Sequence, residues 1–316
     1  MELGRMLAVA ALVAGLLGSY LAAEETPATP AAGEKAPLVS ATYPGLASGC
    51  LTYARLSDLP KGTLLKAGDL ALTEKDVAAE IAKSPQDVRA ELKKNKFYVL
   101  EQIASPKLIV RIAKAEAART GKELPSQVDQ LIVDHHLGGL VEKVEATDAE
   151  VAEFYQNNKD SVGDATLDQV GPQIRQVLVR EKQQAVIARH IETLGQRTAI
   201  EVSAAWVKEQ AALARDNPVD KARASGRPSM VDFGASGCRP CEMMAPILET
   251  LKKKHAGKAN ILFVHVREAQ VLAARYAVQS IPVQVFFDKD GREVFRHVGF
   301  FPQDEIERKL AEMGAE

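Results

Sequence analysis

Apolar residues recur along the chain at two different spacings, which predict two different kinds of domain. Between residues 67 and 202 they recur at helical spacing, as in Leu108, Ile109 and Ile112, and this spacing is typical of helices that bury one face. From residue 230 onward, short runs of consecutive apolar residues alternate with helical segments. The chain is therefore expected to be multidomain, with a mostly α-helical domain followed by an α/β domain that has a mixed central sheet.

Start signals predict where helices begin in the first region. At four places a hydroxyl residue precedes an acidic residue by three positions, so that the hydroxyl can cap free N–H groups and the carboxylate suits the helix dipole. These pairs are Thr73 and Asp76, Ser84 and Asp87, Ser126 and Asp129, and Thr147 and Glu150. Ser105-Pro106 predicts a further start, since proline fits the first helical position. Strands are expected at both ends of the region, a strand-turn-strand over 63–72 and a returning strand over 198–202.

The second region predicts the order strand, helix, strand, helix, hairpin, helix. The expected elements are strands at 230–233 and 260–266, helices at 239–254 and 268–277, paired strands at 283–288 and 293–298, and a helix at 303–312. Between the two regions, residues 214–229 lose the apolar periodicity and gain Gly, Pro, Asp and Ser. The domain boundary is therefore expected there.

The N-terminus has the features of an export signal. Arg5 precedes an uncharged, mostly apolar run over 6–23 that ends in small residues. That run is close to the shortest helix that spans a bilayer, about 17 residues, so a retained membrane anchor stays open beside a cleaved signal peptide. Either way the body of the protein is expected in the bacterial periplasm, where disulfides form and persist. The expected division is 1–23 signal peptide or anchor, 24–66 flexible linker and irregular segment, 67–202 helical domain, 203–216 linker helix and 217–316 α/β domain.

Composition narrows the choice of partners. Of the 316 residues, 46% are hydrophobic and 26% are charged, so most of the chain can bury a core. The formal net charge of -2 gives no reason to expect nucleic acid or an anionic membrane surface as a partner. The oligomeric state stays open.

Two of the three cysteines, Cys238 and Cys241, carry the candidate chemistry. A structural zinc site needs four ligands, and no second Cys or His pair at a suitable spacing accompanies them. A purely structural disulfide across so short a loop would constrain the unfolded chain little. A redox pair fits better, because Cys238 is expected at a helix N-terminus that favours its thiolate, and Cys241 one turn further can release a mixed disulfide. Neither a metal nor a cofactor is expected.

Three stretches resemble the thioredoxin family: "VDFGASGCRPCEMMAPILETL" at 231–251, "QSIP" at 279–282 and "FFDKDGREVFRHVGF" at 286–300. The resemblance implies a thioredoxin fold over 217–316, with Cys238 as the nucleophile and Cys241 as the resolving thiol. It further implies that Asp232 accepts a proton from Cys241, and that a cis bond at Pro282 presents the backbone of Ile281 to substrate. The alternatives are a strand-end acid paired with a neighbour for Asp232 and an ordinary trans proline for Pro282.

The chain departs from the family pattern around this site. Gly234 and Gly237 stand where the family has aromatic residues, and Phe263 stands where it has a basic residue opposite the buried acid, which questions the relay role of Asp232. Between the cysteines, Arg239 favours a thiolate electrostatically, and Pro240 resembles the residue found in reducing members of the family. Arg239 and Pro240 are also expected to contact substrate, and the activity is expected to be that of a reductase.

Residues 67–202 resemble the helical chaperone part of SurA-type periplasmic parvulin proteins. The likeness lies in "LLKAGDLALTEKDVAAEI" at 64–81, "ATDAEVAEFYQNNKDSV" at 146–162 and the long helical pattern over 165–194. It implies a domain that binds unfolded clients. The isomerase domain of that family is missing, so no prolyl isomerase activity is expected. A helical spacer or dimerisation arm is the alternative.

Together these features predict an exported protein-disulfide reductase whose helical domain binds its client. The expected partners are disulfide-containing or unfolded exported proteins and a membrane electron donor that recycles the cysteine pair. The alternative is a periplasmic chaperone or assembly factor in which the thioredoxin fold serves as a docking surface. The third cysteine, Cys50, is expected to be buried or idle.

Overall fold

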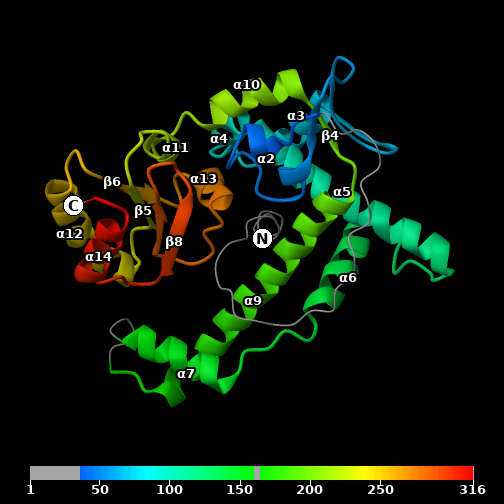
Figure 1. Cartoon of the computed structure of the whole chain (residues 1–316). Helices are drawn as coiled ribbons and strands as arrows, with labels where there is room; N and C mark the ends of the chain where they lie inside the picture. The colour runs from blue at the N-terminus through cyan, green and yellow to red at the C-terminus, as the bar shows by residue number, and fades with distance from the viewer. Residues whose placement is uncertain (1–35, 160–163, 316) are drawn as a thin grey trace.

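The computed structural model describes residues 36–159 and 164–315, so the expected signal segment and residues 24–35 of the expected linker lie outside the described residues. Its strands form two four-stranded sheets, with the orders β1-β4-β2-β3 and β6-β5-β7-β8. Figure 1 shows the two sheets in separate parts of the molecule, and the chain passes from one part to the other after α10 (Ala204–Ala214). The protein is therefore multidomain, as the sequence predicts.

The N-terminal domain is mostly helical around a small sheet. Its helices are α2 (Val39–Thr42), the 3-10 helix η2 (Cys50–Tyr53), α3 (Glu74–Lys83), α4 (Arg89–Lys94), α5 (Lys96–Thr120), α6 (Asp129–Val141), α7 (Asp148–Asn157), α9 (Leu167–Arg197) and α10. Its strands are β1 (Arg55–Ser57), β2 (Thr63–Ala67), β3 (Leu70–Thr73) and β4 (Glu201–Ser203). The strand-turn-strand over 63–72 is confirmed, and the expected returning strand is β4, which pairs with both β1 and β2.

The structure confirms some of the helix starts predicted for this domain and contradicts others. Capping boxes at Thr73 and Thr147 open α3 and α7, as predicted. The starts predicted at Ser84 and Ser126 are wrong, because α4 and α6 begin several residues later. The start at Ser105 is also wrong: this residue lies inside α5, where its hydroxyl donates to the carbonyl O of Glu101 at 3.0 Å. A buried serine that bonds back to its own helix gives no cap.

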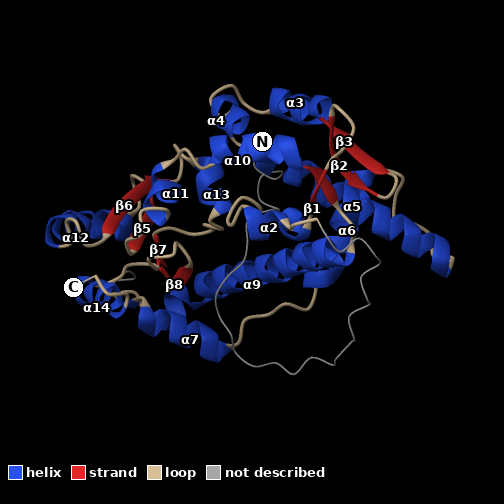
Figure 2. Cartoon of the chain, turned by 45° about the horizontal axis from the view of Figure 1, so that its top comes forward, coloured by secondary structure: helices blue, strands red, loops and turns tan. Residues whose placement is uncertain are grey.

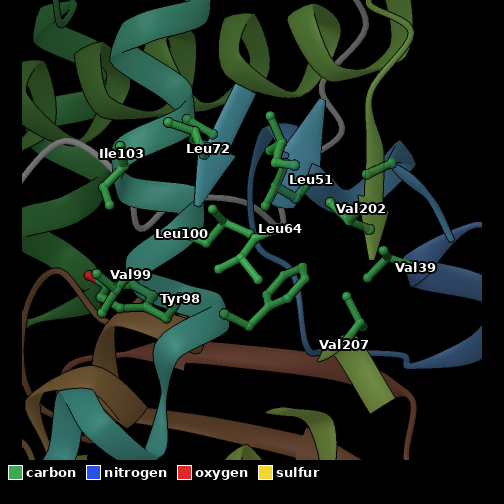
Figure 3. Packing of buried hydrophobic residues seen from close by; sticks show 14 of the residues in the cluster. Val39, Leu51, Leu64, Leu72, Tyr98, Val99, Leu100, Ile103, Val202 and Val207 are labelled. Atoms are coloured by element: carbon green, nitrogen blue, oxygen red, sulfur yellow. The ribbon is translucent and has the colours of Figure 1, made fainter. Parts of the chain in front are cut away.

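Residues 38–66 are part of the core, which corrects their assignment to an irregular linker segment. Val39, Cys50 and Leu51 are fully buried in the cluster that surrounds α5. Figure 3 shows Val39 and Leu51 converging with side chains of α5, β2 and β4. This segment also supplies β1, the edge strand that pairs with β4. Its contacts are with residues distant in sequence, which local patterns do not reveal.

α7 and the first two-thirds of α9 form a projection that we call the arm (residues 148–159 and 164–186). A small core of Val151, Tyr155 and Ile174 joins the two helices. With 31 residues, α9 is about 46 Å long. Its last turns pack on η2, so α9 links the core of the N-terminal domain to the arm. Figures 1 and 2 show the arm lying beside the C-terminal domain.

The C-terminal domain has a mixed sheet covered on both faces. Its elements are α11 (Pro218–Arg223), β5 (Ser229–Gly234), α12 (Arg239–Lys254), β6 (Asn260–His265), α13 (Gln270–Arg275), β7 (Val283–Phe287), β8 (Glu293–Val298) and α14 (Gln303–Glu312). β5 pairs in parallel with β6 and antiparallel with β7, and β7 pairs antiparallel with β8. All six residues of β5 are buried, because α12 and α14 cover one face of the sheet and α11 and α13 the other. The helices predicted at 239–254 and 303–312 are confirmed at both ends.

Direct hydrogen bonds connect the two domains. The buried guanidinium of Arg275 in α13 donates to the carbonyl oxygens of Ala214 at 2.8 Å and Gly45 at 3.0 Å. In the other direction, Glu91 of α4 accepts the backbone N–H of Val271 at 2.9 Å. These bonds fix α13, and with it the rest of the C-terminal domain, against the N-terminal domain.

Candidate active site

The site is centred on a disulfide between Cys238 and Cys241, whose Cα atoms are 5.2 Å apart. Buried β5 ends at Gly234, and a turn with Gly237 at a φ of +75° leads to Cys238, which is the N-cap of α12. Cys238 is partly exposed, whereas Cys241 is only 5% exposed. Solvent and partner molecules therefore reach the disulfide through Cys238.

The start of α12 favours negative charge on Cys238. The backbone N–H of Cys241 donates to Cys238 Sγ at 3.4 Å. Free N–H groups and the helix dipole add to this effect, and both stabilise a thiolate relative to a thiol. Exposed Arg239 and partly exposed Pro240 occupy the first two helical positions, beside the reachable sulfur.

A cis peptide bond between Ile281 and Pro282 lies beside the disulfide, as the resemblance implied. The carbonyl O of Ile281 is 3.9 Å from Cys238 Sγ, which is a packing contact because a disulfide sulfur has no proton to donate. Gly299 helps to hold this loop in place, because its N–H donates to the carbonyl O of Pro282 at 2.8 Å. The backbone of Ile281 is thus next to the sulfur that partners reach.

Asp232, in the middle of β5, is fully buried. Gln284 lies opposite it on β7, and its amide Nε2 donates to Asp232 Oδ1 at 2.7 Å. The other carboxyl oxygen, Oδ2, has no hydrogen-bond partner among the described residues. Burial raises the pKa of this carboxyl to about 6, and the bond from Gln284 only partly opposes that rise. Asp232 can therefore take up or release a proton near neutral pH.

Phe263 and Gly234 form a matched pair next to Cys241. A Cβ on Gly234 would lie 2.9 Å from Cε2 of the Phe263 ring and 3.5 Å from Cys241 Sγ. Phe263, which pairs with Asp232 across β5 and β6, is 45% exposed. The glycine thus makes room for the phenylalanine, so the surface beside the disulfide is aromatic at Phe263. No basic group faces Asp232 from this position.

The structure brings together all the residues that the sequence singled out: Cys238, Cys241, Asp232, Ile281, Pro282, Arg239 and Pro240. It adds Gln284, which the sequence analysis did not assign to the site, and it pairs Phe263 with Asp232, as the sequence analysis expected. Gln284 gave one signal, as a polar residue inside the apolar run of β7. Among residues 36–159 and 164–315, no group of three or more His, Cys, Asp and Glu side chains is arranged to hold a metal ion.

Cys50, by contrast, lies in the core of the N-terminal domain and not at this site. It is fully buried and unpaired, as expected, with Sγ 3.2 Å from the hydroxyl of Ser105. Burial raises the pKa of its thiol far above the ordinary value.

Within the described part of the chain, no helix is both long and apolar enough to span a membrane.

A mixed sheet between helix pairs, with a disulfide at a helix N-terminus and a cis-proline loop beside it, defines the class of thioredoxin-like domains. A sequence profile of the family described as "Thioredoxin-like domain" matches residues 216–314. Through this domain the chain belongs to the thioredoxin family. Thioredoxins of Staphylococcus aureus strains Mu50 and N315 are 46% identical to it over 81 residues, which are 26% of this chain and 77% of theirs.

Two solved structures also align with this part of the chain. Chloroplastic thioredoxin z is 26% identical, over 30% of this chain and 85% of its own, with a TM-score of 0.28. A mutant thioredoxin from Halobacterium salinarum NRC-1 is 30% identical, over 30% of this chain and 81% of its own, with the same TM-score of 0.28. The domain and its relatives support thiol–disulfide oxidoreductase activity.

Proposed function

We propose that the protein is an exported thiol–disulfide oxidoreductase that reduces disulfides in other proteins. The observation that carries this proposal is the disulfide of Cys238 and Cys241 at the start of α12, with one sulfur partly exposed and the other buried. A structural disulfide does not need an exposed sulfur, whereas a redox pair needs one sulfur that partners can reach and one that is protected.

The proposed reaction transfers two electrons to the client. In the reduced protein, the Cys238 thiolate attacks one sulfur of a client disulfide, forms a mixed disulfide and expels the other client sulfur as a thiolate. Cys241 then loses its proton and attacks Cys238 Sγ, which releases the first client sulfur as a second thiolate. The products are two client thiolates, which take up protons from solvent to give the client dithiol, and the Cys238–Cys241 disulfide seen in the structure.

Asp232 is the proposed acceptor for the proton of Cys241. Its pKa of about 6 allows it to be ionised at neutral pH, and one oxygen lacks a partner among the described residues. Because Phe263 replaces the family's basic residue, the bond from Gln284 is the local interaction that favours the carboxylate. Arg239 would favour the Cys238 thiolate, and the backbone of Ile281 would align the client.

The direction of the reaction is proposed to be reduction. Pro240 between the cysteines resembles reducing members of the family, and Arg239 supplies only a solvent-exposed charge. A reduction potential near that of thioredoxin, about -270 mV, is expected rather than one near about -120 mV, which is typical of strong oxidants. Continued turnover then needs a dithiol donor, and export to the periplasm would make this a membrane electron donor.

The N-terminal domain is proposed to bind the unfolded client. Exposed apolar side chains support this role, among them Val128 and Leu131 near the start of α6, which are 57% and 52% exposed. They equally support the second candidate, a chaperone or assembly factor in which the thioredoxin-like domain is a docking surface. No prolyl isomerase activity is expected from either.

Insulin reduction with dithiothreitol as electron source separates the two candidates. The reductase proposal expects turnover by the native protein and none by Cys238→Ser. The matched control is Cys50→Ser, which changes the buried thiol of the other domain and should keep turnover. If the native protein shows no turnover while Cys238→Ser still prevents aggregation of an unfolded client, the chaperone candidate replaces the reductase.

A further inference from the structure

The arm contacts the C-terminal domain at Ser280, which precedes Ile281, and at Gly299, which hydrogen-bonds to Pro282. The side chain of Glu181, on α9, lies close to that of Ser280, the residue before Ile281, and Ser280 partly opposes the rise that burial causes in the pKa of Glu181. Asn158, which ends α7, lies against Gly299: a Cβ on this glycine would be 2.6 Å from Asn158 Oδ1. Only a residue without a side chain permits so close an approach.

Both contacts are made by residues that adjoin the cis peptide bond beside the reactive sulfur. Ser280 directly precedes Ile281, whose carbonyl O is 3.9 Å from Cys238 Sγ. Gly299 donates its N–H to Pro282, the other residue of the cis bond. A partner molecule that lies along the backbone of this loop must therefore also lie next to the arm.

The arm is held in a fixed shape. Lys182 of α9 forms an ion pair with Glu150 of α7 at 2.5 Å, and Arg175 bonds to Asp148. Asn158 Nδ2 donates to the carbonyl O of Phe154 at 2.9 Å, which orients the amide at the end of α7. Several such links across one small core leave Asn158 and Glu181 in defined positions before any partner binds.

The groups on this side of the disulfide suit a polypeptide. The amide of Asn158 and the carboxylate of Glu181 match the N–H and C=O groups of an extended backbone. Val177, one turn before Glu181 on α9, and Val298, next to Gly299, are each 39% exposed and offer apolar contacts. A small disulfide molecule bound at Cys238 is too short to contact both Glu181 and Asn158.

We propose that the arm forms one side of the substrate-binding site, where Glu181 and Asn158 position an extended polypeptide segment that carries the disulfide attacked by Cys238. This inference rests on the proposed reductase function and adds to it two positioning residues from outside the thioredoxin-like domain. It also gives the helical domain a defined task at the redox site.

The test compares the same disulfide in two peptides, one of about 3 residues and one of about 16 residues. The full-length protein is reduced, freed of reductant and mixed with each peptide in single-turnover experiments that give an apparent affinity and a limiting rate. For Glu181→Ala combined with Asn158→Ala, the affinity for the long peptide should fall about tenfold, the effect of losing two hydrogen bonds. The limiting rate, and the reactivity toward the short peptide, should stay within about twofold.

The matched control is Glu153→Ala, which removes an exposed carboxylate from α7 of the same arm and should change neither peptide. The unfolding midpoint and the reduction potential of the double variant should equal those of the native protein. Equal losses toward both peptides, or none toward the long one, would overturn the positioning role. A native protein that reacts with neither peptide would instead overturn the reductase function itself.

Discussion

Each domain of this protein has a buried carboxyl group and a cysteine at the start of a helix, but the two arrangements differ in chemistry. In the N-terminal domain, Glu101 accepts hydrogen bonds from the backbone N–H groups of Ser48, Gly49 and Leu51, and from the hydroxyl of Ser48. In the C-terminal domain, Asp232 accepts one bond, from Gln284, and its Oδ2 has no partner among the described residues. The first carboxyl organises a loop, and the second keeps an oxygen available for a proton.

The cysteines differ in the same way. Cys50 opens η2 but is enclosed by the core, and its thiol has a raised pKa. Cys238 caps a 16-residue helix and is partly exposed. A helix terminus activates a sulfur only where solvent and a partner can reach it, so position in the fold decides which cysteine is reactive.

The largest expected effect is in thiol labelling. After reduction, Cys238 should react with iodoacetamide at least about four orders of magnitude faster than Cys50, since labelling of Cys50 requires an opening that costs several kcal/mol. Peptide mapping by mass spectrometry measures both rates in one sample. In guanidinium the two rates should converge. Similar rates in the native protein would contradict the contrast between the two cysteines.

The second-largest expected effect is the loss of stability when Glu101 is removed. Glu101→Ala leaves three backbone N–H groups, one buried and two partly buried, without their acceptor, so the free energy of unfolding of the N-terminal domain should fall by about 3–5 kcal/mol. The fluorescence of Trp206, the one tryptophan of the chain, follows this domain in guanidinium because the ring packs on Phe97. Glu116→Ala, at an exposed position of the same helix, is the control and should change little. A small effect of Glu101→Ala would show that water replaces the carboxylate.

The sequence predicted the C-terminal domain far better than the loop around Cys50, for a physical reason. The strand at 230–233 and the helix at 239–254 follow from neighbouring residues, because a fully buried strand and an amphipathic helix have local signatures. The loop at 48–51 has no such signature. Its backbone is satisfied by Glu101, about fifty positions away, and only the folded chain brings the two together.

The same limit applies within the active site. Cys238, Cys241, Asp232 and the cis bond at Pro282 could be predicted, because short motifs carry them. The donor to Asp232 could not, since it depends on the register of β5 and β7, which places Gln284 opposite Asp232. Nor could the approach of Glu181 to Ser280, which results from the packing of one domain against another.

A third prediction concerns the stability cost of Asp232. Its carboxyl has a folded-state pKa of about 6 against an ordinary value of 3.8. Above pH 3.8 the unfolded chain releases this proton while the folded chain retains it, so the native residue destabilises the fold increasingly up to about pH 6 and constantly above it. Asp232→Asn should therefore stabilise the C-terminal domain by up to about 3 kcal/mol at pH 7.5 and by little at pH 3.5.

Guanidinium unfolding followed by circular dichroism at the two pH values measures this difference. The asparagine amide of this variant can still accept from Gln284, so the local packing is kept. A variant that is less stable than the native protein at pH 7.5 would mean that the ionised carboxylate of Asp232 stabilises the fold, and the predicted cost of burying this charge would be wrong.

The smallest expected effect tests the single donor of Asp232. Gln284→Leu removes the amide but keeps a side chain of similar volume in buried β7. Because the bond from Gln284 lowers the pKa of Asp232, its loss should raise that pKa above about 6, by about half to one unit. The pKa is measured by NMR of the carboxyl carbon, with Val285→Ile in the same strand as a control that leaves the donor in place. An unchanged pKa would mean that buried solvent, not Gln284, sets the protonation of Asp232. A raised pKa would show that the bond from Gln284 holds down the pKa of Asp232, whereas Glu101 has several donors in place of one.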